Sequence, residues 1–102
     1  MKRYHESLIK ALNDPEEAAE YLNAVLEEGD RKMFLIALKN VAEASGGISK
    51  ISRVTKLNRA NLYKIFSKSG NPEIQTLSSI LGTFGLRLAV EAKSHHHALK
   101  AA

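Results

Sequence analysis

Six cationic side chains stand in a stretch of the chain that holds no Asp or Glu. The stretch SKISRVTKLNRANLYKIFSKSGNP covers residues 49–72, and its cations are Lys50, Arg53, Lys56, Arg59, Lys64 and Lys68. Guanidinium and ammonium groups donate hydrogen bonds to phosphate oxygens and to guanine edges, and their summed field attracts polyanions. The first chemistry that these residues suggest is therefore recognition of nucleic acid.

Two short helical patterns carry these cations. The first runs from about residue 48 to 55 and the second from about residue 59 to 67, with only Lys56, Leu57 and Asn58 between them. Asn58 is a favourable N-cap for the second helix. Two short helices joined by a three-residue turn are typical of a helix-turn-helix, whose second helix enters the DNA major groove.

The second of these helices has an inner face and an outer face. Leu62, Ile65 and Phe66 recur at helical spacing and are expected to face the core. The residues left on the outward stripe are candidates for reading bases, namely Arg59, Ala60, Tyr63 and Lys64. The arginine and the lysine suit guanine O6 and N7, and the tyrosine suits a sugar or a thymine methyl group. The candidates for phosphate contact are Lys50, Arg53, Lys56, Asn61, Ser67 and Lys68.

An ordinary solvated surface is the alternative interpretation of this stretch, because lysines are common on protein surfaces. The absence of acids over residues 45–72, on a two-helix pattern with a three-residue turn, favours nucleic acid instead. Only Tyr63 supplies an exposed aromatic ring for stacking here, so double-stranded DNA is favoured over single-stranded RNA.

The acidic residues concentrate in a different segment, residues 5–30. That segment holds eight carboxylates against Lys10 alone, although the whole chain of 102 residues carries a net charge of +4. Separation of opposite charges along the chain indicates two unlike partners.

The remaining patterns predict one all-α domain over residues 1–93, with about five helices and a short C-terminal β-strand. Asp14 and Pro15 begin the first helix, Gly29 ends it, and Asp30 caps the next one. The predicted units are an N-terminal helix pair at 14–44, the helix-turn-helix at 47–67, a last helix at 72–84, a strand at 86–92 and a flexible tail at 94–102.

The predicted strand needs a partner, because a lone strand leaves its backbone groups unpaired. Its alternating apolar residues are Leu86, Leu88 and Val90. Pairing with the same strand of a second chain gives a homodimer, which an operator of two half-sites requires. The alternative is pairing with RYHESL, residues 3–8 of the same chain.

Several other functions are disfavoured by the composition. The chain has no Cys, which leaves no disulfide, no thiolate zinc site and no Cys nucleophile and suits the cytoplasm. No run is apolar enough for a membrane helix or an export signal. Catalytic motifs are absent, so we expect no enzyme, no cofactor and no small-molecule substrate. The run His95-His96-His97 shares no helix face and comes without a carboxylate, so no metal site is expected.

A family resemblance rests on specific segments. GGISKISRVTKLNRANLYKIFSKSGNPEIQTLSSILGTFGLRLAV looks like an Xre-type, lambda-repressor-like helix-turn-helix domain. Together with the upstream NDPEEAAEYLNAVLEEGDRKMFLIALKNVAEASGG, it resembles the addiction module antidote proteins, the HigA-like antitoxins of type II toxin-antitoxin systems. The resemblance covers residues 6–91, and its most specific parts are DPEEAAEYL, LEEGD, LYK, SGNP and GLRL.

The resemblance implies a protein that represses its own promoter and neutralises a co-encoded toxin, a small basic ribonuclease of the RelE-like class. It implies that the four outward residues of the second helix face the operator, and that Ser49, Lys50 and Asn71 lie near phosphates. The alternatives are a stand-alone phage-type transcriptional repressor and, from another class, a helical protein-protein adaptor.

The acidic segment gains a candidate use from the same resemblance. We hypothesise that five glutamates meet the basic surface of the toxin, namely Glu16, Glu17, Glu20, Glu27 and Glu28. The alternative is a solvated helix face with no partner.

Two positions depart from the family pattern. This chain has Ser52 where the family usually has Ala, and Lys56 where the family usually has Gly. A Gly in the turn would relieve a positive φ. Lys56 therefore either accepts about 1 kcal/mol or more of strain or sits in a slightly different turn.

Overall fold

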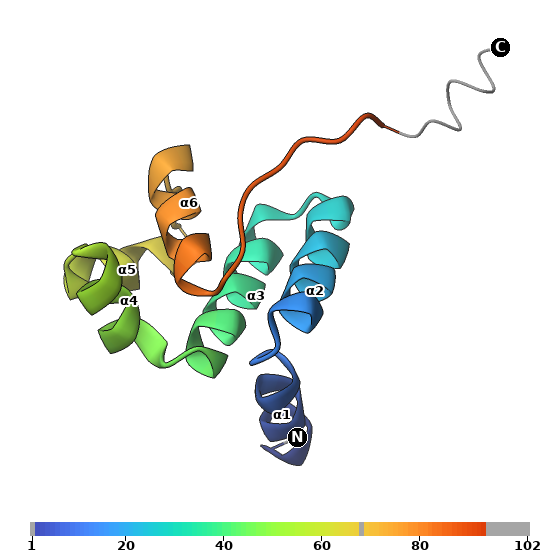
Figure 1. Cartoon of the computed structure of the whole chain (residues 1–102), viewed down its shortest axis with the longest axis horizontal. Helices are drawn as coiled ribbons and strands as arrows, with labels where there is room; N and C mark the ends of the chain where they lie inside the picture. The colour runs from blue at the N-terminus through green and yellow to red at the C-terminus, as the bar shows by residue number, and fades with distance from the viewer. Residues whose placement is uncertain (1, 68, 94–102) are drawn as a thin grey trace, which may run out of the picture.

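The computed structural model of the chain describes residues 2–67 and 69–93. Over these residues the fold is all-α (Figure 1), with helices α1 (Lys2–Ala11), α2 (Pro15–Glu28), α3 (Arg31–Ala44), α4 (Gly47–Thr55), α5 (Arg59–Ile65) and α6 (Ile74–Thr83). Three sequence-based expectations lie outside the described residues: the phosphate contact of Lys68, the flexible tail at 94–102 and the absence of a metal site at His95-His96-His97.

Local capping explains where α2 and α3 begin. The Asp14 carboxylate accepts a hydrogen bond of 3.1 Å from the Glu16 backbone N–H, and Pro15 occupies the first turn of α2. Gly29 ends α2 with a φ of 76°, and the Asp30 carboxylate then accepts from the first turn of α3. The two helices are joined by so few residues that they pack as an antiparallel pair.

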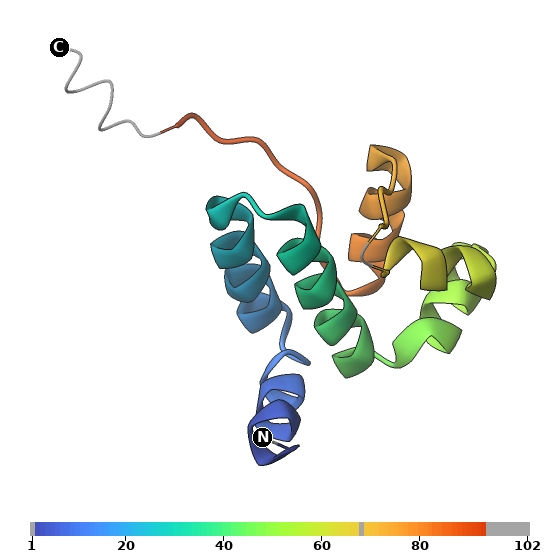
Figure 2. The same ribbon diagram turned by 180° about the vertical axis from the view of Figure 1, so that it is seen from behind.

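Helix α3 is the central element of the core. It packs against α1, α2 and α4, and both ribbon views show it between α2 and the α4–α5 pair (Figure 2). The largest side chains with almost no exposed surface are Leu35, Leu38, Val41, Ile51, Leu62 and Ile80. All of these except Leu35 belong to one hydrophobic cluster, which joins α3, α4, α5 and α6.

The helix boundaries near α5 differ slightly from those expected. Helix α5 ends at Ile65, with Phe66 as its C-cap, and α6 begins at Ile74 after the extended residue Glu73. Gly70 explains the tight connection between them, because an added Cβ would stand 2.0 Å from the Ile65 carbonyl oxygen. Only glycine lets the chain pass so close to the end of α5.

Helix α1 corrects one interpretation of the sequence. Residues 3–8 are helical, so they are not available as a strand partner for residues 86–92, and this alternative is wrong. Leu8 and Leu12 are spaced by one helical turn, and Leu12 is buried in the core. Burial of this apolar edge against α3 stabilises a helix that has no strong capping signal in the sequence.

The C-terminal β-strand is not confirmed. Among the described residues no strand is present, and residues 86–92 run as an extended segment outside regular secondary structure. The physical reason is that a strand exists only in a ladder, and no second strand lies beside this segment. The strand therefore stays a prediction for an assembly of more than one chain.

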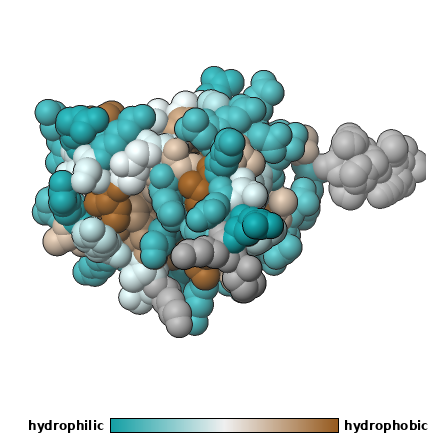
Figure 3. Space-filling model, turned by 90° about the horizontal axis from the view of Figure 1, so that it is seen from below, coloured by the Kyte–Doolittle hydropathy of each residue, from teal (hydrophilic) through white to brown (hydrophobic). Residues whose placement is uncertain are grey.

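The face of the molecule seen from below is mainly hydrophilic (Figure 3). Seen from below, hydrophobic side chains show only as small separate patches between polar ones (Figure 3). None of the described helices has the length and apolar character needed to cross a membrane.

Candidate nucleic-acid interface

Helix α5 has the two faces that its sequence pattern predicts. Leu62 is 0% exposed, and Ile65 and Phe66 are also buried in the core. The four residues expected on the outer stripe, Arg59, Ala60, Tyr63 and Lys64, are all exposed. The Tyr63 side chain keeps 62% of its surface open to solvent although it is aromatic. Burial of the inner face fixes the rotation of α5 about its axis and so fixes which side chains point outward.

The turn between α4 and α5 contains a strained residue. Lys56 has a φ of 68°, the only positive φ of a residue other than Gly within residues 2–67 and 69–93. This left-handed conformation costs a side chain with a Cβ about 1 to 2 kcal/mol. Of the two outcomes considered from the sequence, the chain adopts the strained one.

Ser52 clamps this turn. Its hydroxyl donates a hydrogen bond of 2.6 Å to the Leu57 carbonyl, and its own carbonyl accepts from the Lys56 N–H at 2.9 Å. The Thr55 hydroxyl adds a contact, since it accepts from the Leu57 N–H at 3.2 Å. The Ser at position 52 and the Lys at position 56 therefore belong to one local structure, in which these three hydrogen bonds hold the strained turn.

A side-chain hydrogen bond connects the start of α4 with the start of α5. The Arg59 guanidinium Nη2 donates to the Ser49 hydroxyl at 2.9 Å. Both residues are exposed, and they are ten positions apart in the sequence. The bond leaves other guanidinium N–H groups free to donate outward, and it holds the arginine close to the surface of the helix pair.

Asn58 and Ser67 form side-chain hydrogen bonds to backbone groups at the two ends of α5. The Asn58 side-chain oxygen accepts from the Asn61 N–H at 2.7 Å, so Asn58 is the N-cap. The Ser67 hydroxyl donates to the Lys64 carbonyl at 2.7 Å and is half-buried. Of the candidate phosphate contacts, Ser67 therefore already donates its hydroxyl proton to the end of α5. Asn61 contributes only its backbone N–H to the cap at the start of the helix.

A shallow hollow between α5 and α6 brings three of the predicted residues together. Asn61, Lys64 and Asn71 all line it, and its volume is about 480 Å³. Glu73 lines the same hollow, and its carboxylate makes no capping bond to α6. Glu73 is not among the residues predicted for the interface, although it directly follows the acid-free stretch that ends at Pro72.

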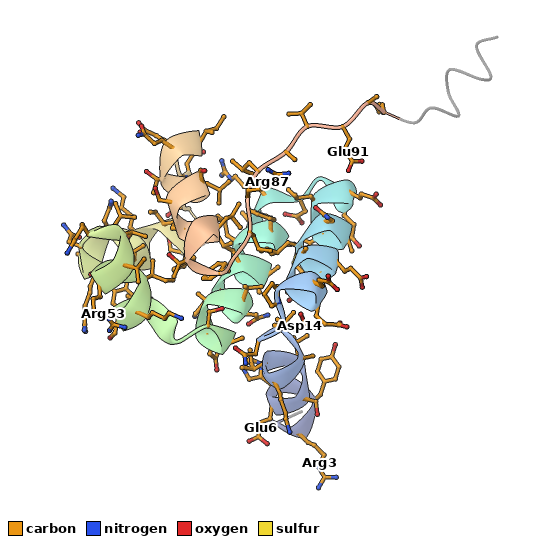
Figure 4. All side chains as sticks on the ribbon, in the orientation of Figure 1. Arg3, Glu6, Asp14, Arg53, Arg87 and Glu91 are labelled. Carbon is orange, nitrogen blue, oxygen red and sulfur yellow. The ribbon has the colours of Figure 1, made fainter. Side chains whose placement is uncertain are left out.

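Lys50 and Arg53 complete the basic face. Lys50 is half-buried, and an added Cβ at Gly46 would stand 2.7 Å from its Cδ, so its stem lies over the start of α4. Arg53 is exposed and lies on the α4–α5 side of the molecule (Figure 4). Lys56, exposed in the turn, extends the same face. We call the cations of α4, α5 and their turn the basic face, namely Lys50, Arg53, Lys56, Arg59 and Lys64.

The acidic side chains gather on α2, on the other side of α3 from the basic face. All five candidate glutamates are exposed: Glu16, Glu17, Glu20, Glu27 and Glu28. At about 100° per residue their positions fall within roughly a third of the helix circumference, opposite the buried Leu22. We call these five residues the acidic ridge.

Beside the acidic ridge lies a groove of about 620 Å³, lined by apolar residues and by Asn23, Glu27, Arg87 and Glu91. Its floor comes from α2, α3 and α6 through Leu22, Phe34 and Leu81, and the extended segment forms one side through Leu86 and Leu88. Leu26 and Leu88 remain 52% and 41% exposed. The sequence patterns did not predict this groove, because it depends on where the segment after α6 lies.

The described residues hold no group of three or more His, Cys, Asp or Glu side chains placed to bind a metal ion. A side-chain contact joins α1 to α3, between His5 Nε2 and Glu43 Oε1 at 3.4 Å, and both side chains are about half exposed.

Comparison with known proteins gives the family. A family model described as "Probable addiction module antidote protein" matches residues 4–92. A protein of Haemophilus influenzae, described as an uncharacterized protein, is 34% identical over 80 residues, which cover 78% of this chain and 81% of that protein. No solved structure matches the chain. The family match spans all six helices from within α1 to the extended segment, and the chain belongs to the family of probable addiction module antidote proteins.

Proposed function

We propose that the protein is a cytoplasmic, non-enzymatic antitoxin of the HigA-like, Xre-type class. In this proposal α4 and α5 form a lambda-repressor-like helix-turn-helix that binds operator DNA in the protein's own promoter. The acidic ridge binds a co-encoded toxin of the RelE-like class. Membership in the antidote family supports the toxin partner, and the basic face supports the DNA partner.

The observation that carries the DNA proposal is the orientation of α5. Its apolar face is buried, while Arg59, Tyr63 and Lys64 point to solvent beside the cations of α4. A helix that enters the major groove needs this combination of a fixed inner face and outward donors. The exposed Tyr63 ring is available for contact with a sugar or a thymine methyl group.

Phosphate contact is assigned to the residues around the ends of the helix pair. Lys50, Arg53 and Lys56 supply charge from α4 and the turn, and Asn61 and Asn71 supply amide donors from the hollow. Ser49 contributes indirectly, because it holds Arg59. Contacts of this kind set affinity and its salt dependence, whereas the outward residues of α5 set sequence preference.

The proposed assembly is a homodimer. A dimer presents two copies of α5 to two half-sites, and the extended segment with Leu86, Leu88 and Val90 is the proposed contact. Exposure of Val90 to 99% supports this assignment, since an apolar side chain gains by leaving water.

The test is co-expression with the neighbouring open reading frame, followed by a gel shift on the DNA upstream of the gene. We expect a stable complex of the two proteins, and a shift of the upstream duplex that weakens steeply with added salt. A promoter shift with no protein partner would favour a stand-alone repressor. Capture of an acidic protein, with no preference for any duplex, would favour an adaptor.

A further inference from the structure

Arg59 stands at a position where α5 does not favour a cation. It is the first residue of the helix, and the unpaired N–H groups of a first helical turn carry partial positive charge that repels a guanidinium. Within residues 2–67 and 69–93 the arginine forms no ion pair that would offset this repulsion. The local structure of α5 therefore gives no reason for an arginine here, and a contact outside the protein does.

The hydroxyl of Ser49 is the partner of this guanidinium. Arg59 Nη2 donates to Ser49 Oγ at 2.9 Å, and no other cation of the basic face forms a side-chain hydrogen bond within the described residues. A hydroxyl is neutral, so the bond holds the guanidinium without cancelling its charge. The N–H groups that the bond does not use stay available, and two of them are enough for a bidentate contact with guanine O6 and N7.

Both ends of this hydrogen bond are attached to rigid parts of the fold. Ser49 belongs to α4, whose Ile51 is fully buried, and Arg59 begins α5, whose Leu62 is fully buried. The hydrogen bonds of Ser52 fix the turn between the two helices. A serine side chain is short and has few rotamers, so its hydroxyl is a fixed anchor for the long arginine side chain. The guanidinium is thereby held in one place before a ligand binds.

Advance positioning of a cation matters more for contact with a base than for contact with a phosphate. Hydrogen bonds to a base edge depend on distance and angle, whereas a phosphate attracts a cation from many directions. An arginine that is ordered before binding also loses less side-chain entropy when it contacts its ligand. The held guanidinium of Arg59 is therefore suited to reading a base.

We infer that Ser49 is a positioning residue that aims Arg59 at one guanine in each half-site of the operator. Arg59 makes the bidentate contact, and the Ser49 hydroxyl determines which base pair receives it. Ser49 thus controls sequence preference without touching a base. The inference rests on the proposed function, and it adds the identity of one base and the residue that governs its selection.

Ser49→Ala tests the inference on the full-length protein. Loss of the hydroxyl frees the guanidinium, so affinity for the operator is expected to fall by about three- to tenfold. Affinity for random duplexes and its salt slope are expected to stay at parental values, because no charge changes. Ser49→Thr keeps the hydroxyl and is expected to bind the operator like the parent. The matched control is Ser78→Ala, which removes an exposed hydroxyl from α6 and is expected to change none of these quantities.

Duplexes with one replaced base pair show whether the hydroxyl acts on base choice. Each G·C pair of the operator is changed in turn to A·T, and fluorescence anisotropy gives the loss of affinity for the parent and for Ser49→Ala. The parent is expected to lose most at one pair in each half-site, where guanine O6 and N7 meet Arg59. In Ser49→Ala the loss at this pair is expected to shrink, while losses at the other pairs stay parental. Equal profiles, or tighter operator binding by Ser49→Ala, overturn the inference.

A double-mutant cycle tests whether Ser49 acts only through Arg59. If it does, Ser49→Ala has no further effect on operator binding in an Arg59→Ala background. Additive losses mean that Ser49 contacts the duplex itself, and they overturn the positioning role. The protein without DNA gives a second measurement, because the Arg59 Nε–H is expected to be more mobile in Ser49→Ala than in the parent by ¹⁵N relaxation. Equal mobility in the two proteins also overturns the positioning role.

These outcomes separate the inference from the proposed function. A parent protein that binds no duplex with sequence preference overturns both. A parent that binds its operator specifically, while Ser49→Ala keeps the parental base profile, overturns the inference alone. DNA recognition then rests on the outward residues of α5 without help from α4.

Discussion

The basic face and the acidic ridge are built in different ways, although both are charged surfaces on helices. On the basic face, side chains are held in place: Ser49 bonds Arg59, Ser52 clamps the turn, and Asn58 caps α5. On the acidic ridge, none of the five glutamates forms an ion pair within the described residues. Within the described residues, one cation of the basic face, Arg59, has a side-chain hydrogen-bond partner, whereas the glutamates of the acidic ridge have no ion-pair partner.

The difference fits two kinds of recognition. Reading base edges requires donors at fixed positions, because each hydrogen bond depends on distance and angle. Attracting a basic protein surface requires only a field of the right sign, since rim charges act mainly on the association rate. The contrast leads us to expect sharp, position-specific losses from changes on α5 and gradual losses from changes on α2.

The largest expected effect comes from Arg59→Ala. Loss of a donor to a guanine edge is expected to weaken binding to the specific operator by about 1 to 3 kcal/mol and to relax sequence preference. The matched control is Arg53→Ala, which is expected to weaken specific and random duplexes alike and to lower the slope of log affinity against log salt by about one. Fluorescence anisotropy titrations at several salt concentrations measure both quantities.

Equal losses on specific and random DNA for the two arginine variants would place Arg59 among the phosphate contacts. The basic face would then resemble the acidic ridge, because the charge of a side chain would matter more than its position.

An intermediate effect is expected when the five glutamates of the acidic ridge are changed to Gln. The association rate with the toxin is expected to fall by about tenfold at low salt and by much less at high salt. Glu43→Gln on α3 is the matched control, because it removes an exposed carboxylate away from the ridge. Stopped-flow mixing measures the rates, and unchanged rates in the fivefold variant would support the solvated-face interpretation.

The smallest effect is expected at the turn. Lys56→Gly removes the strain of the left-handed conformation, and we expect it to raise the free energy of unfolding by up to about 1 kcal/mol. Arg53→Gly places a glycine in the last turn of α4 and is expected to lower the free energy of unfolding by up to about 1 kcal/mol. Urea unfolding followed by circular dichroism gives the free energy of unfolding of both variants. If Lys56→Gly lowers this free energy as Arg53→Gly does, Lys56 is not strained.

The parts of the fold that the sequence predicts are those set by neighbouring residues. Capping by Asp14, Asp30 and Asn58 depends on side chains within three positions, so the helix starts are visible in the sequence. The inner face of α5 follows in the same way from apolar spacing. Helix α1 was not predicted, because it has no such cap and depends on burial against α3.

The candidate site is predictable in its residue types and less so in its geometry. The bond between Ser49 and Arg59 joins residues ten positions apart, and no local pattern signals it. Glu73 enters the hollow only because the chain doubles back at Gly70. The clamp at Ser52 was signalled by its departure from the family pattern, but its hydrogen bond to Leu57 depends on the turn conformation.

The central position of α3 has a consequence for how two partners share one small protein. Helix α3 lies between the acidic ridge and the basic face. A protein bound at α2 and a duplex bound at α5 would therefore lie on different sides of the molecule. In the proposed function the toxin and the duplex would therefore contact different helices. Any cooperativity between them has to travel through the buried contacts of α3 with α4, or through dimerisation.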